Sequence, residues 1–230
     1  MSKILRNVGV VTGILVGAAH AKFDGFYTGA SVGYMNQNTS IDAKQNPANR
    51  FAHVNKGTGH QGSPTAELFL GWGKVFGGCF YGGLEGKIDL VLGRNQKVAE
   101  DTGFIFKSGR KGLGIAALVR LGCLVTPTTM IYGGVGVKAL RFDHDLFEKS
   151  EKISAPFSQK TLNLLTEVGV ETAVGSSHHL RFRFAYAFMP KKSMTRTTTQ
   201  FPAKHMYRDQ GILKTSGTEH AVKLGVIYSF

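Results

Sequence analysis

The sequence predicts an all-β fold, an eight-stranded antiparallel up-and-down transmembrane β-barrel with short periplasmic turns and four long extracellular loops. Three observations carry this prediction. Apolar and polar residues alternate with a period of two over eight segments, as in strands whose two faces meet different environments. Long and short connections alternate along the chain, which is typical of an outer-membrane barrel. Beyond the N-terminal segment, no run of residues is apolar and long enough for a spanning helix.

The chain opens with a segment typical of a secretory signal peptide. Lys3 and Arg6 form a basic start, residues 8–16 are mostly apolar and uncharged, and an Ala-His-Ala cleavage pattern ends at Ala21. The apolar run is too short to span a membrane as a helix. We expect cleavage after Ala21, which leaves residues 22–230 as one outer-membrane β-barrel domain in a Gram-negative bacterium.

The first three predicted strands are bounded by turn or loop residues. Residues 26–35 and 65–75 alternate apolar side chains with small or polar ones, and the stretch 36–63 between them is rich in Asn, Gln, Gly and His, a loop composition. A Gly-Gly pair then marks a tight turn. The third strand, 80–92, alternates Leu and Ile with Tyr, Gly, Glu, Lys and Asp.

The next four predicted strands repeat this pattern. Residues 111–125 and 130–141 are joined by a short Thr-Pro-Thr-Thr turn, and residues 161–174 and 179–189 by a Gly-Ser-Ser turn. The remaining connections are polar, and we expect them to be long loops together with the first one. Their ranges are 93–109, 143–160 and 190–215.

The eighth strand, 216–230, shows the alternation most clearly. Its apolar face consists of Val222, Leu224, Val226, Tyr228 and Phe230, and the face between them carries Glu219 and Lys223. A strand with lipid on one side and a polar lumen on the other explains every position. The rival explanation is a closing strand of a soluble β-sandwich, although an exposed terminus usually frays in water.

Charges on the polar faces indicate which face lies inside. A soluble, secreted eight-stranded barrel that binds a small apolar ligand would place the apolar face inside. The polar face, however, carries six acids and six bases, a balance that a closed narrow lumen requires because an unpaired buried charge is costly. It is also rich in Gly, which suits the crowded interior of a small barrel. The predicted lumen network is Glu67, Glu85, Lys87, Asp89, Arg120, Lys138, Glu167, Glu171, Arg181, Arg183, Glu219 and Lys223.

The formal net charge of +13 must then lie outside the lumen. The fourth predicted loop has six bases against one acid, Asp209, and so attracts anionic partners such as lipopolysaccharide phosphates, sulfated glycans or nucleic acid without sequence specificity. The alternative is that these bases only keep the loop solvated and bind no anionic partner. The six are Lys191, Lys192, Arg196, Lys204, Arg208 and Lys214.

Four segments resemble one family. The sequences GFYTGASVGY, AELFLGWGKVF, YGGLEGKIDL and the terminal VKLGVIYSF look like the eight-stranded outer-membrane barrel of the outer membrane protein A and opacity-protein type. The resemblance covers nearly the whole mature chain. It implies insertion by the barrel assembly machinery, which reads a C-terminal aromatic strand with Tyr228 and Phe230 here. It also implies surface loops that bind host or environmental partners, a structural or adhesin-like role.

Catalytic alternatives are weaker. A lipid-modifying barrel enzyme needs a Ser, a His and an acid together on the outer surface, but the Ser-Ser-His-His sequence at 176–179 lies in a predicted periplasmic turn. A barrel protease of the omptin kind uses Asp and His at the outer rim, where residues 143–145 read Asp-His-Asp, but it has more strands. We therefore expect no enzyme. A porin role is weak too, because eight strands enclose a filled interior.

No cofactor or metal site is expected. His53, His60, His144 and His205 fall in predicted loops at no metal-binding spacing, and we expect them to be solvated. The many glycines alternate with strand residues and never open a helix, so no phosphate-binding loop is present.

Cys79 and Cys123 are candidates for a disulfide in the oxidising periplasm. A hairpin centred near residue 101 would place them nearly opposite each other at the periplasmic end. Strand alternation argues against the bond, because it points Cys79 inward and Cys123 outward. The alternative is two small residues packed near the rim.

Overall fold

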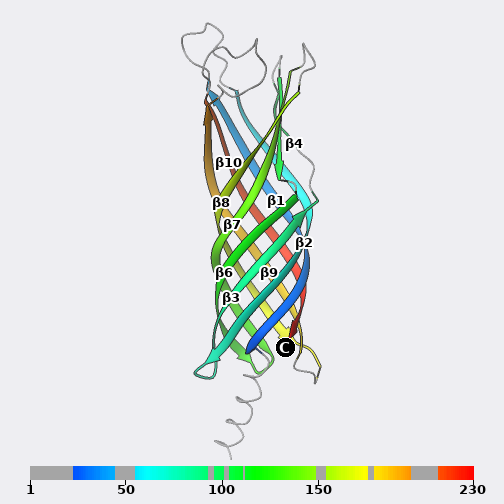
Figure 1. Ribbon diagram of the computed structural model, residues 1–230, viewed down its shortest axis with the longest axis vertical. Coiled ribbons are helices and arrows are strands. Elements are labelled where there is room, and N and C mark those ends of the chain that lie inside the picture. Colours follow the sequence, from blue (N-terminus) through cyan, green and yellow to red (C-terminus); the bar gives the residue numbers. More distant parts are fainter. Residues whose placement is uncertain are drawn as a thin grey trace, which may run out of the picture.

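Eight long antiparallel strands form one closed barrel in this computed structural model, which describes residues 23–44, 55–92, 96–100, 104–110, 112–148, 154–175, 179–197 and 212–230 (Figure 1). A shorter hairpin extends it at one end. The barrel strands are β1 (Gly25–Lys44), β2 (Asn55–Phe76), β3 (Phe80–Val91), β6 (Gly112–Thr126), β7 (Thr129–Glu148), β8 (Ser154–Ala173), β9 (Leu180–Thr197) and β10 (Ile212–Ser229). The hairpin consists of β4 (Gln96–Glu100) and β5 (Phe104–Arg110).

Each barrel strand pairs with the next barrel strand along the chain, and one further pairing completes the ring. The first and last strands pair through β1 and β10, with Tyr27 opposite Ser229. The backbone N–H of Phe230 donates to the Phe26 carbonyl at 3.1 Å, which carries the ladder to the last residue. Closure satisfies the backbone groups that an open sheet edge would expose to lipid.

The strands run farther than the sequence predicted at the end opposite the short turns. β1, β2, β7, β8, β9 and β10 extend well into stretches predicted as loops, and β4 and β5 form inside another of those stretches. The outward side chains of these extensions are mostly polar, and their inward faces mix polar residues such as Gln37 with apolar ones such as Ile41 and Phe142. The regular alternation that marks a membrane strand in the sequence is lost there, because water replaces lipid on the outer side.

The two faces of the barrel differ as the sequence predicted. Large apolar side chains point outward on every barrel strand: Val32, Leu68, Leu84, Leu121, Val135, Leu164, Phe184 and Leu224 are all about half exposed or more. The inward positions hold nearly all the buried side chains. Within the described residues no helix has the length and apolar character needed to cross a membrane.

Apolar clusters lie in the lumen on both sides of its charged middle. Toward the short turns lie Phe23, Val75, Tyr81, Met130 and Tyr132. Toward the other end lie Met35, Val91, Leu118, Leu140, Leu165 and Met189 with their neighbours. The charged groups between them therefore sit in a dry section of the barrel, where ion pairs are screened little by water.

Candidate functional site

The structure places all twelve predicted lumen charges inside the barrel. Each of these residues is at most 6% exposed. They come from seven of the eight barrel strands, β2, β3, β6, β7, β8, β9 and β10, because each lies on the inward phase of its strand. The lumen is thus occupied by side chains from all around the ring.

Two carboxylates form the centre of the network. Glu85 contacts Arg120 at 2.9 Å, Arg183 at 2.6 Å and Lys87 at 3.1 Å between charged atoms. Glu171 contacts Arg120, Arg183 at 2.8 Å and Arg181 at 3.1 Å. Each carboxylate therefore faces three bases, which offsets the cost of removing it from water.

Lysines connect the remaining acids. The Lys87 amine lies 2.7 Å from Glu167 and 3.4 Å from Glu67. The Lys223 amine lies 2.5 Å from Glu67 and 3.5 Å from Glu167. These four residues join the cluster around Glu85 through Lys87. The contacts of Glu85 with Arg120 and of Lys87 with Glu67 join β3 to its two neighbouring strands, β6 and β2.

A separate ion-pair group lies nearer the long-strand end. The Lys138 amine contacts Asp89 at 3.3 Å and Glu219 at 3.4 Å. It brings β7, β3 and β10 together across the lumen. All twelve charges thus have a partner of opposite sign.

Aromatic side chains complete the charged layer, a role that the alternation of residues alone does not predict. The Tyr27 hydroxyl donates to Glu85 at 2.8 Å and accepts from Arg120 at 2.8 Å. The Tyr132 hydroxyl donates to Glu167 at 3.0 Å, and its ring lies 3.8 Å from the Arg120 guanidinium carbon. Arg183 stacks on Phe69 at 4.0 Å. Cation–π contacts and hydroxyl bonds therefore use donors and acceptors that the ion pairs leave open.

Glycines opposite these rings give them room. Tyr27 pairs with Gly71 across β1 and β2, and a Cβ at Gly71 would lie 2.4 Å from the Tyr27 ring. Phe69 pairs with Gly29 in the same two strands, and a Cβ there would lie 2.4 Å from the Phe69 ring. The signal in the sequence is a large aromatic and a glycine on the same inward face of neighbouring strands, which becomes visible once the register is known.

The residues assigned to the basic loop are divided by the structure. Lys191, Lys192 and Arg196 lie in β9 and Lys214 lies in β10, so the prediction of a loop at these positions is wrong. The cause is the same loss of alternation beyond the membrane. Lys204 and Arg208 lie outside the described residues. Lys191 and Lys214 are exposed.

The two aromatic residues of the expected assembly signal point outward near the short-turn end. Tyr228 is 49% exposed and Phe230 is 75% exposed, and their rings meet edge to face at 5.4 Å. His179 stacks on Tyr228, and its Nδ1 lies 2.8 Å from the Ser229 carbonyl oxygen. This histidine is thus engaged with the end of β10, whereas residues 176–178 of the predicted turn lie outside the described residues.

In the Asp-His-Asp sequence on β7, Asp143 and His144 point to opposite faces of the barrel wall. Asp143 faces outward and contacts Arg141 at 3.0 Å, whereas His144 faces the lumen and is 2% exposed. The prediction of a solvated His144 is therefore wrong, because β7 continues past it and alternation turns it inward. His60 does lie on the surface, 2.6 Å from Asn38, whereas His53 and His205 fall outside the described residues. No group of three or more metal-binding side chains occurs among the residues described.

Cys79 and Cys123 are free thiols in the structure. The expected pairing was displaced by one residue: Phe80 lies opposite Cys123, and the Leu124 N–H donates to the Cys79 carbonyl at 2.8 Å. The connection between β3 and β6 contains its own hairpin of β4 and β5, so its midpoint does not set the register.

Comparison with solved structures shows a likeness of fold to two outer-membrane β-barrels, OprG and OmpT. The outer membrane protein OprG from Pseudomonas aeruginosa has a TM-score of 0.52 and 15% identity, covering 90% of this chain and 96% of OprG. The outer membrane protease OmpT from Escherichia coli has a TM-score of 0.50 and 8% identity, and the match covers 90% of this chain and 97% of OmpT. Ail, the attachment invasion locus protein of Yersinia pestis, has a TM-score of 0.39 and 12% identity, and the match covers 90% of this chain and 99% of Ail. At these identities the likeness concerns the fold alone.

The family itself is shown at the level of sequence. No curated protein sequence matches the chain significantly. The family described as the OmpA-like transmembrane domain, however, matches residues 21–230. This match includes every strand of the closed barrel. The chain belongs to the OmpA-like transmembrane domain family of eight-stranded outer-membrane β-barrels.

Proposed function

We propose that this protein is a surface-interaction protein of the bacterial outer membrane, with an adhesin-like role at its extracellular end and a structural role for its barrel. The observation that carries the proposal is the change of outward residues along single strands. On β1 the outward side chains are apolar up to Tyr34 and then become Asn36, Asn38, Ser40 and Asp42. On β10 the outward residues before Val222 are polar, beginning with Lys214.

These extensions lift a polar surface away from the membrane. The stretch of β1 from residue 36 to 44 covers on the order of 25 to 30 Å of strand at about 3.3 Å per residue. Ladder hydrogen bonds with β2 and β10 hold it in the barrel wall. A wall that continues beyond the lipid supports binding at the cell surface, because the membrane-spanning part of a barrel needs only about 9–11 residues per strand.

The filled lumen supports a structural body more than a transport path. The charged cluster reaches across the lumen from β3 to β8 and β9 through Glu85, Glu171 and Arg183. Apolar residues lie on both sides of it. Eight strands leave room only for side chains in such an interior. Insertion would depend on lipid, lipopolysaccharide and the barrel assembly machinery, with Tyr228 and Phe230 as the assembly signal.

Retention of whole cells on heparin-coated beads tests the surface role. Cells that display the protein are compared with cells displaying a variant in which all six bases Lys191, Lys192, Arg196, Lys204, Arg208 and Lys214 are changed to Glu, at equal surface amounts. We expect retention at low salt to fall to the level of cells without the protein and the difference to fade with added salt. Equal retention of both cell types at low salt would contradict the anionic partner.

A further inference from the structure

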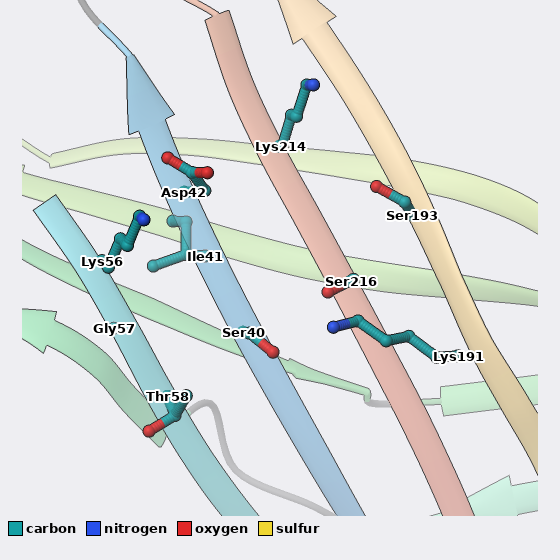
Figure 2. A pocket seen from close by; sticks show the side chains of 10 residues that line it. All are labelled: Ser40, Ile41, Asp42, Lys56, Gly57, Thr58, Lys191, Ser193, Lys214 and Ser216. Carbon is teal, nitrogen blue, oxygen red and sulfur yellow. The ribbon is translucent and has the colours of Figure 1, made fainter. Parts of the chain in front are cut away.

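An open pocket of about 400 Å³ lies on the outer face of the barrel wall at the extracellular end. It crosses four adjacent strands, β9, β10, β1 and β2, above the apolar band of each (Figure 2). Its polar lining side chains point outward, on the opposite side of the wall from the lumen. The pocket is thus separate from the charged network inside the barrel.

Hydroxyl groups run across the pocket in one row. Ser216 pairs with Ser193 on one side and with Ser40 on the other, and Ser40 pairs with Thr58. Four strands therefore present one hydroxyl each at the same level of the wall. With strands about 4.8 Å apart the row spans on the order of 14 Å, which is longer than a single tetrahedral anion.

Lysines lie on both sides of this row. In the backbone register, Lys214 and Lys56 both lie opposite Asp42 on the neighbouring strands. All three residues lie two positions farther from the membrane than the hydroxyl residues of their own strands. Lys191 lies on the membrane side, and its side chain extends across β10 toward Ser216 and Ser40 (Figure 2). Three amines against one carboxylate leave an excess of two positive charges. Asp42 lies between Lys214 and Lys56 in the register, and its negative charge offsets the repulsion between their two amines.

We propose that this pocket binds a sugar carrying phosphate or sulfate groups. Lysine amines and hydroxyls are donors suited to the oxygens of such groups, and the hydroxyl row is long enough for more than one sugar unit. Ser40 lies six positions along β1 from Tyr34, the last large apolar residue on the outer face of that strand. This height suits the phosphorylated sugars of lipopolysaccharide in the same leaflet and also a sulfated glycan arriving from another surface.

The inference rests on the proposed surface role and specifies its site. A change at Lys56 tests the pocket separately from the proposed surface role. Lys56 belongs to the pocket but not to the six bases reversed in the cell experiment. Lys160 is a matched control, because it is also an exposed lysine facing outward at the extracellular end, on β8, and it does not line the pocket. Changing either residue to Glu alters the net charge equally.

Binding is measured with the full-length protein in detergent micelles, using phosphorylated lipopolysaccharide, the same lipopolysaccharide after chemical dephosphorylation, and a heparin hexasaccharide. We expect Lys56→Glu to weaken binding about tenfold, as for loss of one charge-assisted hydrogen bond, and Lys56→Arg to preserve it. Lys160→Glu should bind as the native protein does. Native heat-modifiable gel mobility of each variant verifies that the barrel is folded.

The probes identify the source of the ligand. If Lys56→Glu weakens the binding of phosphorylated lipopolysaccharide alone, the ligand of the pocket comes from the protein's own leaflet. If it weakens the binding of heparin alone, the ligand is an external glycan. Equal binding by Lys56→Glu and Lys160→Glu with both probes would overturn the pocket, whatever the cell-retention result. Equal affinity for phosphorylated and dephosphorylated lipopolysaccharide, with no binding of heparin, would overturn it as well.

Discussion

Arg120 is the residue on which the lumen depends most directly. It is fully buried and contacts Glu85, Glu171, the Tyr27 hydroxyl and the Tyr132 ring. A guanidinium suits this position because its planar fork serves several acceptors at once and stacks on an aromatic face. A lysine would offer a point charge without the stacking.

Replacing Arg120 by Leu leaves Glu85 and Glu171 with one base fewer in a dry section. We expect the free energy of unfolding to fall by about 3–5 kcal/mol, the cost of breaking a buried ion pair from one side. Arg141→Leu removes an outward guanidinium whose side chain is 57% exposed, and its effect should stay under about 1 kcal/mol. Urea titrations of both variants in lipid vesicles measure the difference. Equal unfolding midpoints would show that the network adds no stability.

A second residue-scale prediction concerns Gly71, which faces the Tyr27 ring. A Cβ there would also lie 2.7 Å from the Leu84 carbonyl oxygen, so Gly71→Ala forces both ring and backbone to move. We expect a loss of about 1–3 kcal/mol in stability. Gly133→Ala is the control, because a Cβ at Gly133 meets nothing within 4 Å. The same urea titration checks both, and a larger loss for Gly133→Ala would contradict the close fit.

At the scale of the element, β10 closes the barrel and carries the two residues proposed as the assembly signal. Its inward residues Lys223 and Glu219 join the lumen ion pairs, and its outward residues end on Phe230. Its ladder with β1 closes the barrel.

We predict that Phe230→Ala lowers the fraction of protein inserted in the outer membrane more than Phe80→Ala does. Both side chains are outward and strongly exposed, at 75% and 64%, and both lie near the short-turn end. They bury similar area in lipid, so an excess effect of Phe230 reports recognition during assembly. Heat-modifiable gel mobility of outer-membrane fractions measures insertion. Similar insertion of the two variants would remove Phe230 from the assembly signal.

The membrane-spanning part of each element could be predicted from the sequence, because lipid and lumen impose opposite demands on alternate residues. Leu224 and Lys223, for example, can exchange environments only by a slip of the whole strand. The extensions could not be predicted, since Gln37 inside and Asn38 outside are both polar. The sequence did not predict that Cys79 lies opposite Leu124, because a connection that contains its own hairpin does not fix the register between the strands it joins. The contacts of Tyr27 could not be predicted either, because they depend on the register.

At the scale of the whole molecule, the same charges and apolar residues explain folding, membrane residence and surface exposure. Balanced charges fill the lumen, the apolar residues contact lipid, and the excess bases lie beyond the membrane on strands such as β9 and β10. A soluble barrel with an apolar interior is excluded by this arrangement, because its charges and its apolar side chains would have to exchange places.

Site-directed labelling along β10 tests this central claim most directly. In a protein with Cys79 and Cys123 replaced by Ser, single cysteines are placed at each position from 221 to 226, labelled with a fluorophore and exposed to a lipid-soluble quencher in vesicles. We predict strong quenching at Val222, Leu224 and Val226 and weak quenching at the three positions between them. Quenching of the opposite phase, or equal quenching at all six positions, would contradict a barrel with lipid outside and charges within.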